Sequence, residues 1–309
     1  MNKYVIFFAL FYSFCLTCIA QQKAMYTQYM FNALAINPAY AAVDEAMAVT
    51  ALSRHQWTGF TGAPNTQTIS FHTPVKESNT FLGALLVRDQ IGEVITETGG
   101  CLTVAQRVKV GENSYVSLGI NAGLSSLKAD YSEMYSQSST STDDPSFIDE
   151  NSIRGNMGIG VMLFSDKYYV GISSPHLYYD DLILLTKNPT SLAYRPHYMV
   201  QAGYLLNIND DFKLKPNLLI KYVNGAPVQF DLNANLLIKE TVWLGASYRS
   251  LDSFDGMLSM FITPDIQFGY SYDFITTKLA SVQKGSHEIM LKFRLPVKGR
   301  DPARLACYF

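Results

Sequence analysis

The side chains that most often carry catalysis or bind metals are few in this chain and lie far apart in its sequence. The five histidines are His55, His72, His176, His197 and His287, and no His-x-x-x-His spacing occurs among them. A zinc site needs ligands at a defined spacing, so the sequence predicts no metal site. It also predicts no catalytic residues, because no nucleophile and base can be placed within reach of each other.

One stretch, Ser286-His287-Glu288, invites comparison with a Ser-His dyad. It opens a segment with alternating apolar residues, which predicts a strand. Successive residues of a strand point to opposite faces, so Ser286 and His287 cannot meet within it. No P-loop or dinucleotide fingerprint occurs either. We therefore expect a protein that is not an enzyme and that uses no cofactor.

The acidic pairs and the cysteines have equally plain interpretations. Asp143-Asp144 and Asp180-Asp181 do not supply the roughly six to eight oxygens of a calcium site, so we interpret them as solvated loop charge. Two of the four cysteines, Cys101 and Cys307, lie beyond the first twenty residues. We expect Cys101 in a strand and Cys307 in a tail, as two inert thiols rather than a disulfide scaffold.

The composition limits the kinds of fold that can position these residues. The chain has 309 residues, of which 48% are hydrophobic and only 16% charged, with 20 Tyr and 18 Phe. Ordinary soluble domains carry about 25% charged residues. So much apolar surface excludes a disordered chain, and the formal net charge of −2 argues against a protein that neutralises nucleic-acid phosphates.

The first twenty residues have the features of an export signal. Lys3 supplies a positive start, Val5 to Phe14 an apolar stretch, and Cys18-Ile19-Ala20 a small-x-small cleavage site. An N-terminal anchor helix and a lipoprotein signal at Cys18 are the alternatives. We expect residues 1–20 to be a signal peptide. Beyond them the sequence has no run of about 20 apolar residues that would form a membrane helix.

From Met47 onward the dominant pattern is alternation of apolar and polar residues, which predicts strands. In 288–295, for example, Ile289, Leu291 and Phe293 share one face, and the residues between them are polar or Met. Fourteen such segments are predicted, at 46–54, 66–74, 80–89, 97–109, 114–124, 154–164, 167–175, 196–208, 212–223, 227–239, 241–250, 254–263, 265–275 and 286–295.

The connections between these segments favour a membrane barrel. Tight turns such as Ser165-Asp166 and Asn209-Asp210 alternate with longer links such as Ser125–Ile153 and His176–Arg195. An all-β, up-and-down transmembrane β-barrel of about 14 antiparallel strands has such unlike ends. A soluble sandwich or propeller is the alternative. The polar face is rich in amides, hydroxyls and glycine, and tyrosines at strand ends suggest an interfacial belt: Tyr168, Tyr169, Tyr178, Tyr179, Tyr194 and Tyr198.

The predicted barrel spans residues 46–295 and leaves a segment on either side. Residues 21–45 are aromatic and rich in amides without alternating, and we expect them at the periplasmic mouth or in the lumen. They either brace the barrel or contact a periplasmic partner. The candidate residues of this segment are Tyr29, Phe31, Asn37, Pro38 and Tyr40. Residues 296–309, which begin with Pro296, are predicted to be a periplasmic tail.

Several motifs along the mature chain match a known family. They include Tyr29-Met-Phe-Asn32, Asn37-Pro-Ala-Tyr40, Arg54-His-Gln-Trp-Thr-Gly59, Gly62-Ala-Pro-Asn-Thr-Gln67, Asp231-Leu-Asn-Ala-Asn235, Trp243-Leu-Gly-Ala-Ser-Tyr-Arg249, Gly269-Tyr-Ser-Tyr-Asp273 and Gly285-Ser-His-Glu-Ile-Met-Leu291. In these motifs, in their order and spacing, the chain resembles the PorP/SprF family of type IX secretion membrane proteins.

This resemblance implies a non-enzymatic outer-membrane barrel of the Bacteroidetes gliding and secretion machinery. It implies a function in secretion and surface attachment of a partner adhesin, through the C-terminal domain of that adhesin. It also implies contact with a periplasmic secretion-ring component or a peptidoglycan-linked lipoprotein. We expect no nucleic-acid partner, and outer-membrane lipid around the barrel.

We expect the outer loops, especially Gln56–Asn65 and Ser125–Ile153, to form the cargo-binding face. The candidate residues there are Arg54, Gln56, Trp57, Gly59, Phe60 and Pro64, with Trp57 and Phe60 as aromatic anchors. The alternative is structural, a loop fixed by glycine and proline that folds into the lumen. The alternative function is passive transport of small solutes through the outer membrane. The sequence leaves open whether the lumen is plugged.

Overall fold

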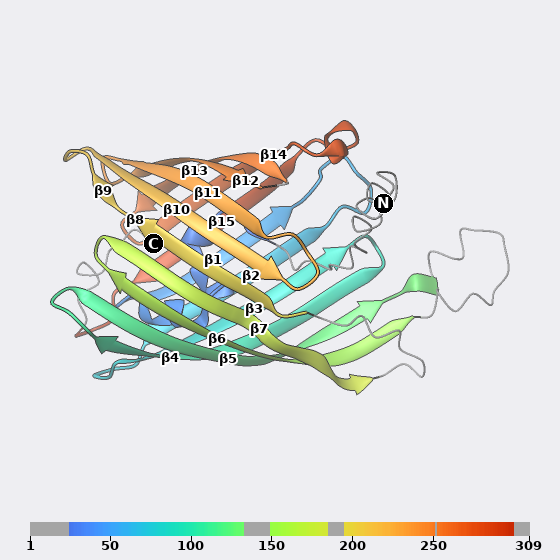
Figure 1. Ribbon diagram of the computed structural model, residues 1–309, viewed down its shortest axis with the longest axis horizontal. Helices are drawn as coiled ribbons and strands as arrows, with labels where there is room; N and C mark the ends of the chain where they lie inside the picture. The colour runs from blue at the N-terminus through green and yellow to red at the C-terminus, as the bar shows by residue number, and fades with distance from the viewer. Residues whose placement is uncertain (1–24, 133–148, 185–194, 251, 300–309) are drawn as a thin grey trace, which may run out of the picture.

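The computed structural model describes residues 25–132, 149–184, 195–250 and 252–299, which form a closed antiparallel β-barrel (Figure 1). Its strands are β1 (Met47–His55), β2 (Asn65–Pro74), β3 (Thr80–Ile91), β4 (Ile95–Lys109), β5 (Ser114–Ala129), β6 (Glu150–Ser165), β7 (Tyr168–Leu184), β8 (His197–Tyr204), β9 (Leu206–Asn207), β10 (Phe212–Val223), β11 (Gln229–Ile238), β12 (Val242–Arg249), β13 (Ser253–Thr263), β14 (Ile266–Ile275) and β15 (Ser286–Leu295). Consecutive strands pair with each other, except that β8 and β9 both pair with β10, and β1 pairs with β15 to close the barrel.

The described barrel wall consists of fourteen strands, because β8 and β9 are two parts of one strand interrupted only at Leu205. Both parts pair with β10, β8 from His197 to Gly203 and β9 at Leu206 and Asn207. The predicted up-and-down barrel of fourteen strands is confirmed. Closure matters in lipid, since it leaves no strand edge with unsatisfied backbone groups.

The alternating sequence pattern places apolar side chains outside and polar side chains inside. On β11, Leu232 is 49% exposed on the outer face, whereas Asn233 and Asn235 face the lumen and are buried. Two of the tyrosines expected in an interfacial belt were predicted wrongly. Tyr169 and Tyr179 point inward, because their positions on β7 share the parity of its luminal residues.

The two ends of the barrel differ, as expected for an up-and-down transmembrane barrel. At one end lie the longer connections 56–64 and 276–285, the second containing the short helix η5 (Lys278–Ser281), and the ends of β5, β6, β7 and β8 that flank residues outside the described ranges. The other end has tighter turns, such as 110–113 and 166–167. We call the first the outer end and the second the periplasmic end.

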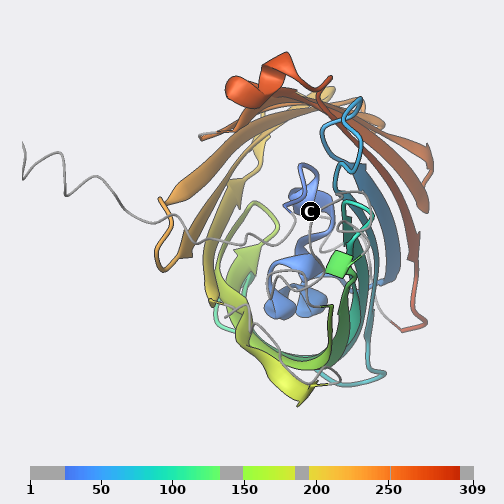
Figure 2. The same ribbon diagram turned by 90° about the vertical axis from the view of Figure 1, so that its right-hand side faces the viewer.

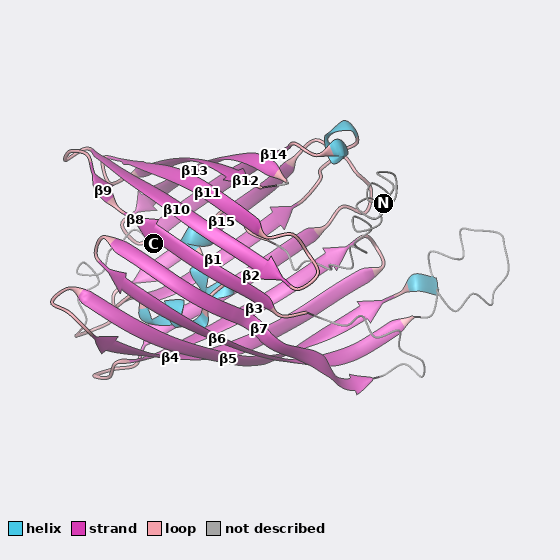
Figure 3. Ribbon diagram, viewed as in Figure 1, coloured by secondary structure: helices cyan, strands magenta, loops and turns pink. Residues whose placement is uncertain are grey.

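Three strands reach further than the sequence pattern indicated. β5 continues to Ala129, β6 begins at Glu150, and β7 continues through Pro175 to Leu184 (Figure 3). The predicted loops Ser125–Ile153 and His176–Arg195 are therefore shorter. Pro175 is tolerated because it lies in a bulge, where the register between β6 and β7 shifts around Gly158. The predicted link Gln90–Thr96 is likewise a tight turn of residues 92–94 between β3 and β4.

The remaining described elements are three 3-10 turns before the first strand: η1 (Tyr29–Phe31), η2 (Ala33–Ala35) and η3 (Pro38–Ala42). Within the described ranges, no helix combines the length and the apolar character needed to cross a membrane. The expected signal peptide and most of the C-terminal tail, including Cys307, lie outside the described residues.

Candidate functional site

Residues 25–46, which we call the luminal plug, occupy the interior of the barrel (Figure 2). Nearly every side chain from Tyr26 to Val43 is buried. Asn37 explains how the plug turns: its side-chain oxygen accepts a hydrogen bond of 2.9 Å from the backbone N–H of Ala39. Pro38 follows at the first position of η3, where its missing N–H costs nothing. The Asn37-Pro38 sequence thus starts a compact turn that fits inside the wall.

Apolar side chains of the plug form one core with inward side chains of the wall. The plug contributes Tyr29, Met30, Phe31, Leu34, Ile36 and Tyr40, and the wall contributes Phe81, Phe164, Tyr169, Leu219, Leu237, Trp243 and Met290. Phe31 packs on Trp243 with ring centroids 6.1 Å apart. This part of the lumen is therefore packed like a protein interior rather than lined like a water-filled pore.

Glycines of the wall make room for the plug backbone. A Cβ atom added at Gly119 of β5 would collide with the backbone of Pro38 and Ala39. One added at Gly160 of β6, directly opposite Gly119, would collide with the Asn37 side chain. The wall is thus smooth where the turn of the plug lies closest to it.

A buried ion-pair cluster anchors the start of the plug. Arg54 of β1 lies 2.6 Å from Asp273 of β14 and 3.2 Å from Glu288 of β15. Thr27 donates its hydroxyl to Asp273 at 2.9 Å and accepts from Arg54 at 2.9 Å. The backbone N–H groups of Thr27 and Gln28 both donate to Glu288, at 2.9 and 2.8 Å. Three strands and the plug therefore share one network of charge-assisted hydrogen bonds.

Arg249 of β12 extends this cluster around the wall. It pairs with Asp231 at 3.1 Å and lies 3.8 Å from both Asp255 and Asp273. It also donates to the hydroxyl of Thr27 at 3.3 Å. The two arginines thus neutralise part of a larger group of luminal carboxylates.

Two further ion pairs hold the other end of the plug at the periplasmic rim. Arg294 donates two hydrogen bonds of 2.8 Å to Asp44, and Arg107 pairs with Glu45. Burial raises the pKa of Asp44, but the Arg294 guanidinium outweighs that effect and lowers the pKa below its ordinary value. The plug is thus anchored near the outer end by Thr27 and at the periplasmic rim by Asp44 and Glu45.

Above the plug, a cavity of about 410 Å³ opens at the outer end of the lumen, and we call it the outer vestibule. The residues that matter for its chemistry are Met25, Arg54, Trp57, Gln229, Arg249 and Asp252. Its floor is charged and its rim comes from the ends of strands far apart in the sequence. It combines charged groups, an amide and an indole around one space.

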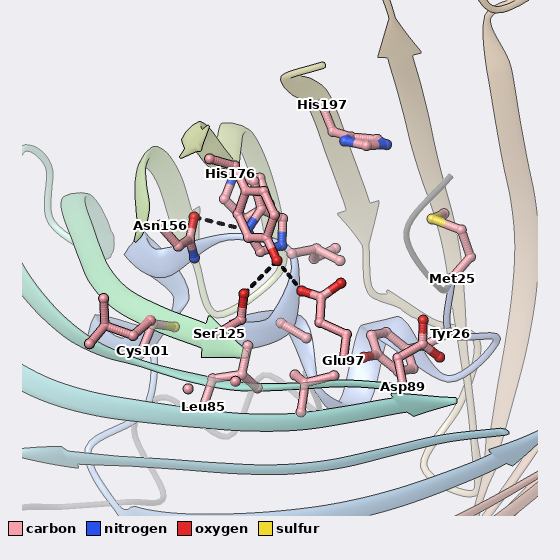
Figure 4. A pocket seen from close by; sticks show the side chains of 18 of the residues that line it. Met25, Tyr26, Leu85, Asp89, Glu97, Cys101, Ser125, Asn156, His176 and His197 are labelled. Atoms are coloured by element: carbon pink, nitrogen blue, oxygen red, sulfur yellow. Dashed lines mark hydrogen bonds between the residues drawn. The ribbon is translucent and has the colours of Figure 1, made fainter. Parts of the chain in front are cut away.

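A second, smaller cavity of about 90 Å³ lies between the plug and strands β3 to β8 (Figure 4). His176 and Asn156 face each other there, with Nδ1 and Oδ1 2.9 Å apart. Tyr179 donates to Glu97 and lies 2.6 Å from the Ser125 hydroxyl. Cys101 lines this cavity as a buried free thiol. These polar side chains of its wall thus bond to one another.

The loop of residues 56–64 is fixed to its neighbours. Trp57 has a positive φ of 46°, and its backbone N–H donates a hydrogen bond of 3.2 Å to the Ser286 hydroxyl. Thr58 exchanges backbone hydrogen bonds with the 276–285 connection. Gly59 has a positive φ of 87°. Gln56, Trp57 and Pro64 line the vestibule, whereas Phe60 is 52% exposed beyond it. The motif therefore combines a fixed backbone with side chains that face the vestibule and the exterior.

The structure places the candidate residues of the N-terminal segment together inside the lumen. Tyr29, Phe31, Asn37, Pro38 and Tyr40 are all buried there. Arg54, which the sequence grouped with the outer loop, instead points into the lumen and holds the plug.

Neither Thr27 of the plug nor the wall residues that receive it, Asp273, Glu288, Gly119 and Gly160, stood out in the sequence. For the four wall residues the only signal was their inward parity on predicted strands.

Ser286 and His287 lie on opposite faces of β15. Ser286 is buried inside and accepts from Trp57, and His287 contacts Tyr270 at 2.7 Å on the outer face. No group of three or more His, Cys, Asp or Glu side chains suited to a metal ion occurs among the residues that the structure describes.

Comparison with known proteins gives one family and one fold. The profile of a family described as type IX secretion system membrane protein PorP/SprF matches residues 18–293. No curated protein matches the chain. Similar solved structures include the CymD monoaromatic hydrocarbon channel, at 13% identity over 86% of this chain and 93% of that chain with a TM-score of 0.50. A Pseudomonas aeruginosa FadL homologue is 12% identical, covers 85% and 93%, and has a TM-score of 0.48. At these identities the likeness concerns the fold alone.

Proposed function

The chain belongs to the PorP/SprF family of type IX secretion system membrane proteins, and from that premise we propose that it is a plugged, non-enzymatic platform of the secretion and gliding machinery. It lies in the outer membrane, as its family and its barrel fold require. In this proposal it supports the secretion and surface attachment of a partner adhesin rather than the passage of solutes.

The observation that supports this proposal most is the filled lumen. The plug packs against the wall with buried apolar side chains. Ion pairs anchor it near both ends, a buried one at Arg54–Asp273 and a partly buried one at Arg294–Asp44. A conducting barrel needs a continuous polar path, whereas this lumen contains a packed core. A rigid plugged barrel is suited to hold partners at its two rims.

The two rims suggest which partner meets which end. The outer rim presents the fixed loop 56–64 with Phe60 exposed and Trp57 at the vestibule, and we assign it to the C-terminal domain of the adhesin. The periplasmic rim presents short turns and the described start of the tail. We assign it to a secretion-ring component or a peptidoglycan-linked lipoprotein.

The test is a secretion assay in cells whose own copy of the gene is deleted and replaced by variants. We expect the double substitution Trp57→Ala and Phe60→Ala to reduce adhesin at the cell surface, while the barrel level in the outer membrane stays unchanged. The matched control is Tyr198→Ala with Tyr222→Ala, an exposed stacked pair on the outer face of β8 and β10. Equal surface adhesin in both variants and in the wild type would contradict the assignment of the outer rim.

A second measurement separates this proposal from a solute channel. The purified protein in planar bilayers should show no large steady conductance, because the plug closes the lumen. A large steady conductance of the wild-type protein, combined with unimpaired adhesin export in the deletion strain, would favour passive transport.

A further inference from the structure

We propose that the outer vestibule is a binding site for a short cationic peptide segment of an exported partner. This deepens the proposed function and rests on it for the identity of the partner. The vestibule volume of about 410 Å³ falls within the range of about 300–1,000 Å³ typical of ligand sites. It opens at the outer end, beside the loop 56–64, where an exported chain would arrive.

The vestibule wall holds a hydrogen-bond donor and an acceptor whose partners are not supplied by the described protein. Arg54 is 1% exposed, and its Nε has no partner although its two other nitrogens are engaged. Gln229 lines the same cavity with a buried Oε1 that also lacks a partner. Buried polar groups are normally paired, so such groups indicate a ligand that supplies both an acceptor and a donor. A peptide offers both.

The charge around the vestibule favours a cationic side chain on that peptide. The carboxylates in contact with Arg54 and Arg249 are Asp231, Asp252, Asp255, Asp273 and Glu288. Against them stand the two arginines and the nearby Lys221. Two carboxylates line the cavity itself, Asp89 and Asp252. Asp89 accepts a hydrogen bond from Thr66, and the side chain of Asp252 is one-third exposed. The carboxylates exceed the cations, which attracts a lysine or arginine and disfavours an acidic peptide.

The amide of Gln229 and the indole of Trp57 define the specificity of this site. The amide oxygen accepts from a lysine ammonium or a peptide N–H, and the indole supplies a face on which a cationic stem can pack. Neither side chain belongs to the ion-pair network that anchors the plug. Both can therefore be changed without removing the plug's anchor.

The experiment is a fluorescence titration of the mature full-length protein in detergent micelles. The probes are acetyl-Ala-Lys-Ala-amide and acetyl-Ala-Glu-Ala-amide, and the signal is the emission of Trp57, one of two tryptophans. The other, Trp243, is buried against the plug. We expect a saturable change with the lysine peptide, its loss in Trp57→Phe, and no saturable change with the glutamate peptide. Gln229→Leu should weaken lysine-peptide binding about 5- to 10-fold without lowering thermal stability.

The matched control is Gln106→Leu, an exposed glutamine near the periplasmic end of β4, which should leave binding unchanged. Equal binding of both peptides, or an unchanged affinity in Gln229→Leu, would overturn the site. Lysine-peptide binding seen only after residues 21–24 are deleted would also overturn it, since the occupant would then be this chain's own Lys23 segment. The titration uses purified protein and does not depend on export. The vestibule site can therefore be refuted while the secretion assay supports the proposed function, and the proposed function can be refuted while the titration supports the site.

Discussion

Substituting Gly119 by alanine should loosen the luminal plug without breaking the barrel. The added Cβ would collide with three backbone atoms of Pro38 and Ala39. These atoms belong to η3 and cannot rotate away as a flexible side chain would. Either the plug or strand β5 must therefore shift. The matched control is Gly256→Ala on β13, where an added Cβ meets nothing within 4 Å.

The size of the effect follows from the cost of overpacking. Forcing extra volume into a packed interior costs about 1–3 kcal/mol. Because the atoms that the Cβ of Gly119→Ala meets are backbone and cannot rotate away, we expect a cost in the upper half of that range, about 2–3 kcal/mol. If that cost falls on the docked plug, its local opening becomes more frequent. An exchange rate governed by such opening would rise about 30- to 150-fold, whereas Gly256→Ala should leave it within about twofold.

The assay is hydrogen exchange of the plug, followed by mass spectrometry on the purified protein in micelles. A double variant tests the same packing at a second contact. The Cβ added in Gly160→Ala collides with the Asn37 side chain, so combining it with Asn37→Ala should recover part of the protection from exchange that Gly160→Ala loses. Plug exchange that is as slow in Gly119→Ala as in Gly256→Ala would refute the close packing of plug and wall. Full additivity of Gly160→Ala and Asn37→Ala would refute the specific contact.

Three further outcomes follow from the ion pairs and the vestibule. Arg54→Ala leaves Asp273 and Glu288 buried without their main partner, so the free energy of unfolding in urea should fall by about 3 kcal/mol. Substituting the exposed Arg88 by alanine should leave that free energy nearly unchanged, and equal losses in the two variants would contradict the anchoring role of Arg54. Arg294 holds the pKa of Asp44 below its ordinary value despite burial, so Asp44 stabilises the fold above its unfolded pKa of about 4 and loses that effect as pH falls through the folded value. The penalty of Asp44→Asn should therefore be constant from about pH 5 to 8 and shrink below about pH 4, and a penalty that grows in acid would contradict this sign. Raising salt should weaken lysine-peptide binding to the vestibule, because its attraction to Asp252 is screened.

The sequence by itself determined the barrel. Strict alternation on segments such as 288–295 separates a lipid face from a luminal face, and tight turns between adjacent strands leave antiparallel neighbours as the only pairing. Both signals depend only on residues close together in the chain, so one sequence is enough to detect them. The family motifs indicated the family but not where their side chains lie in the barrel.

Only the tertiary structure decided what fills the lumen. Thr27 and Glu288 are 261 positions apart in sequence, and Gly119 meets Pro38 only because β5 faces the plug across the barrel. Arg54 reads as part of a loop motif, yet it anchors the plug because barrel closure brings β14 and β15 beside β1. Strand periodicity states which face a side chain occupies. It carries no information about which distant segment that face will meet.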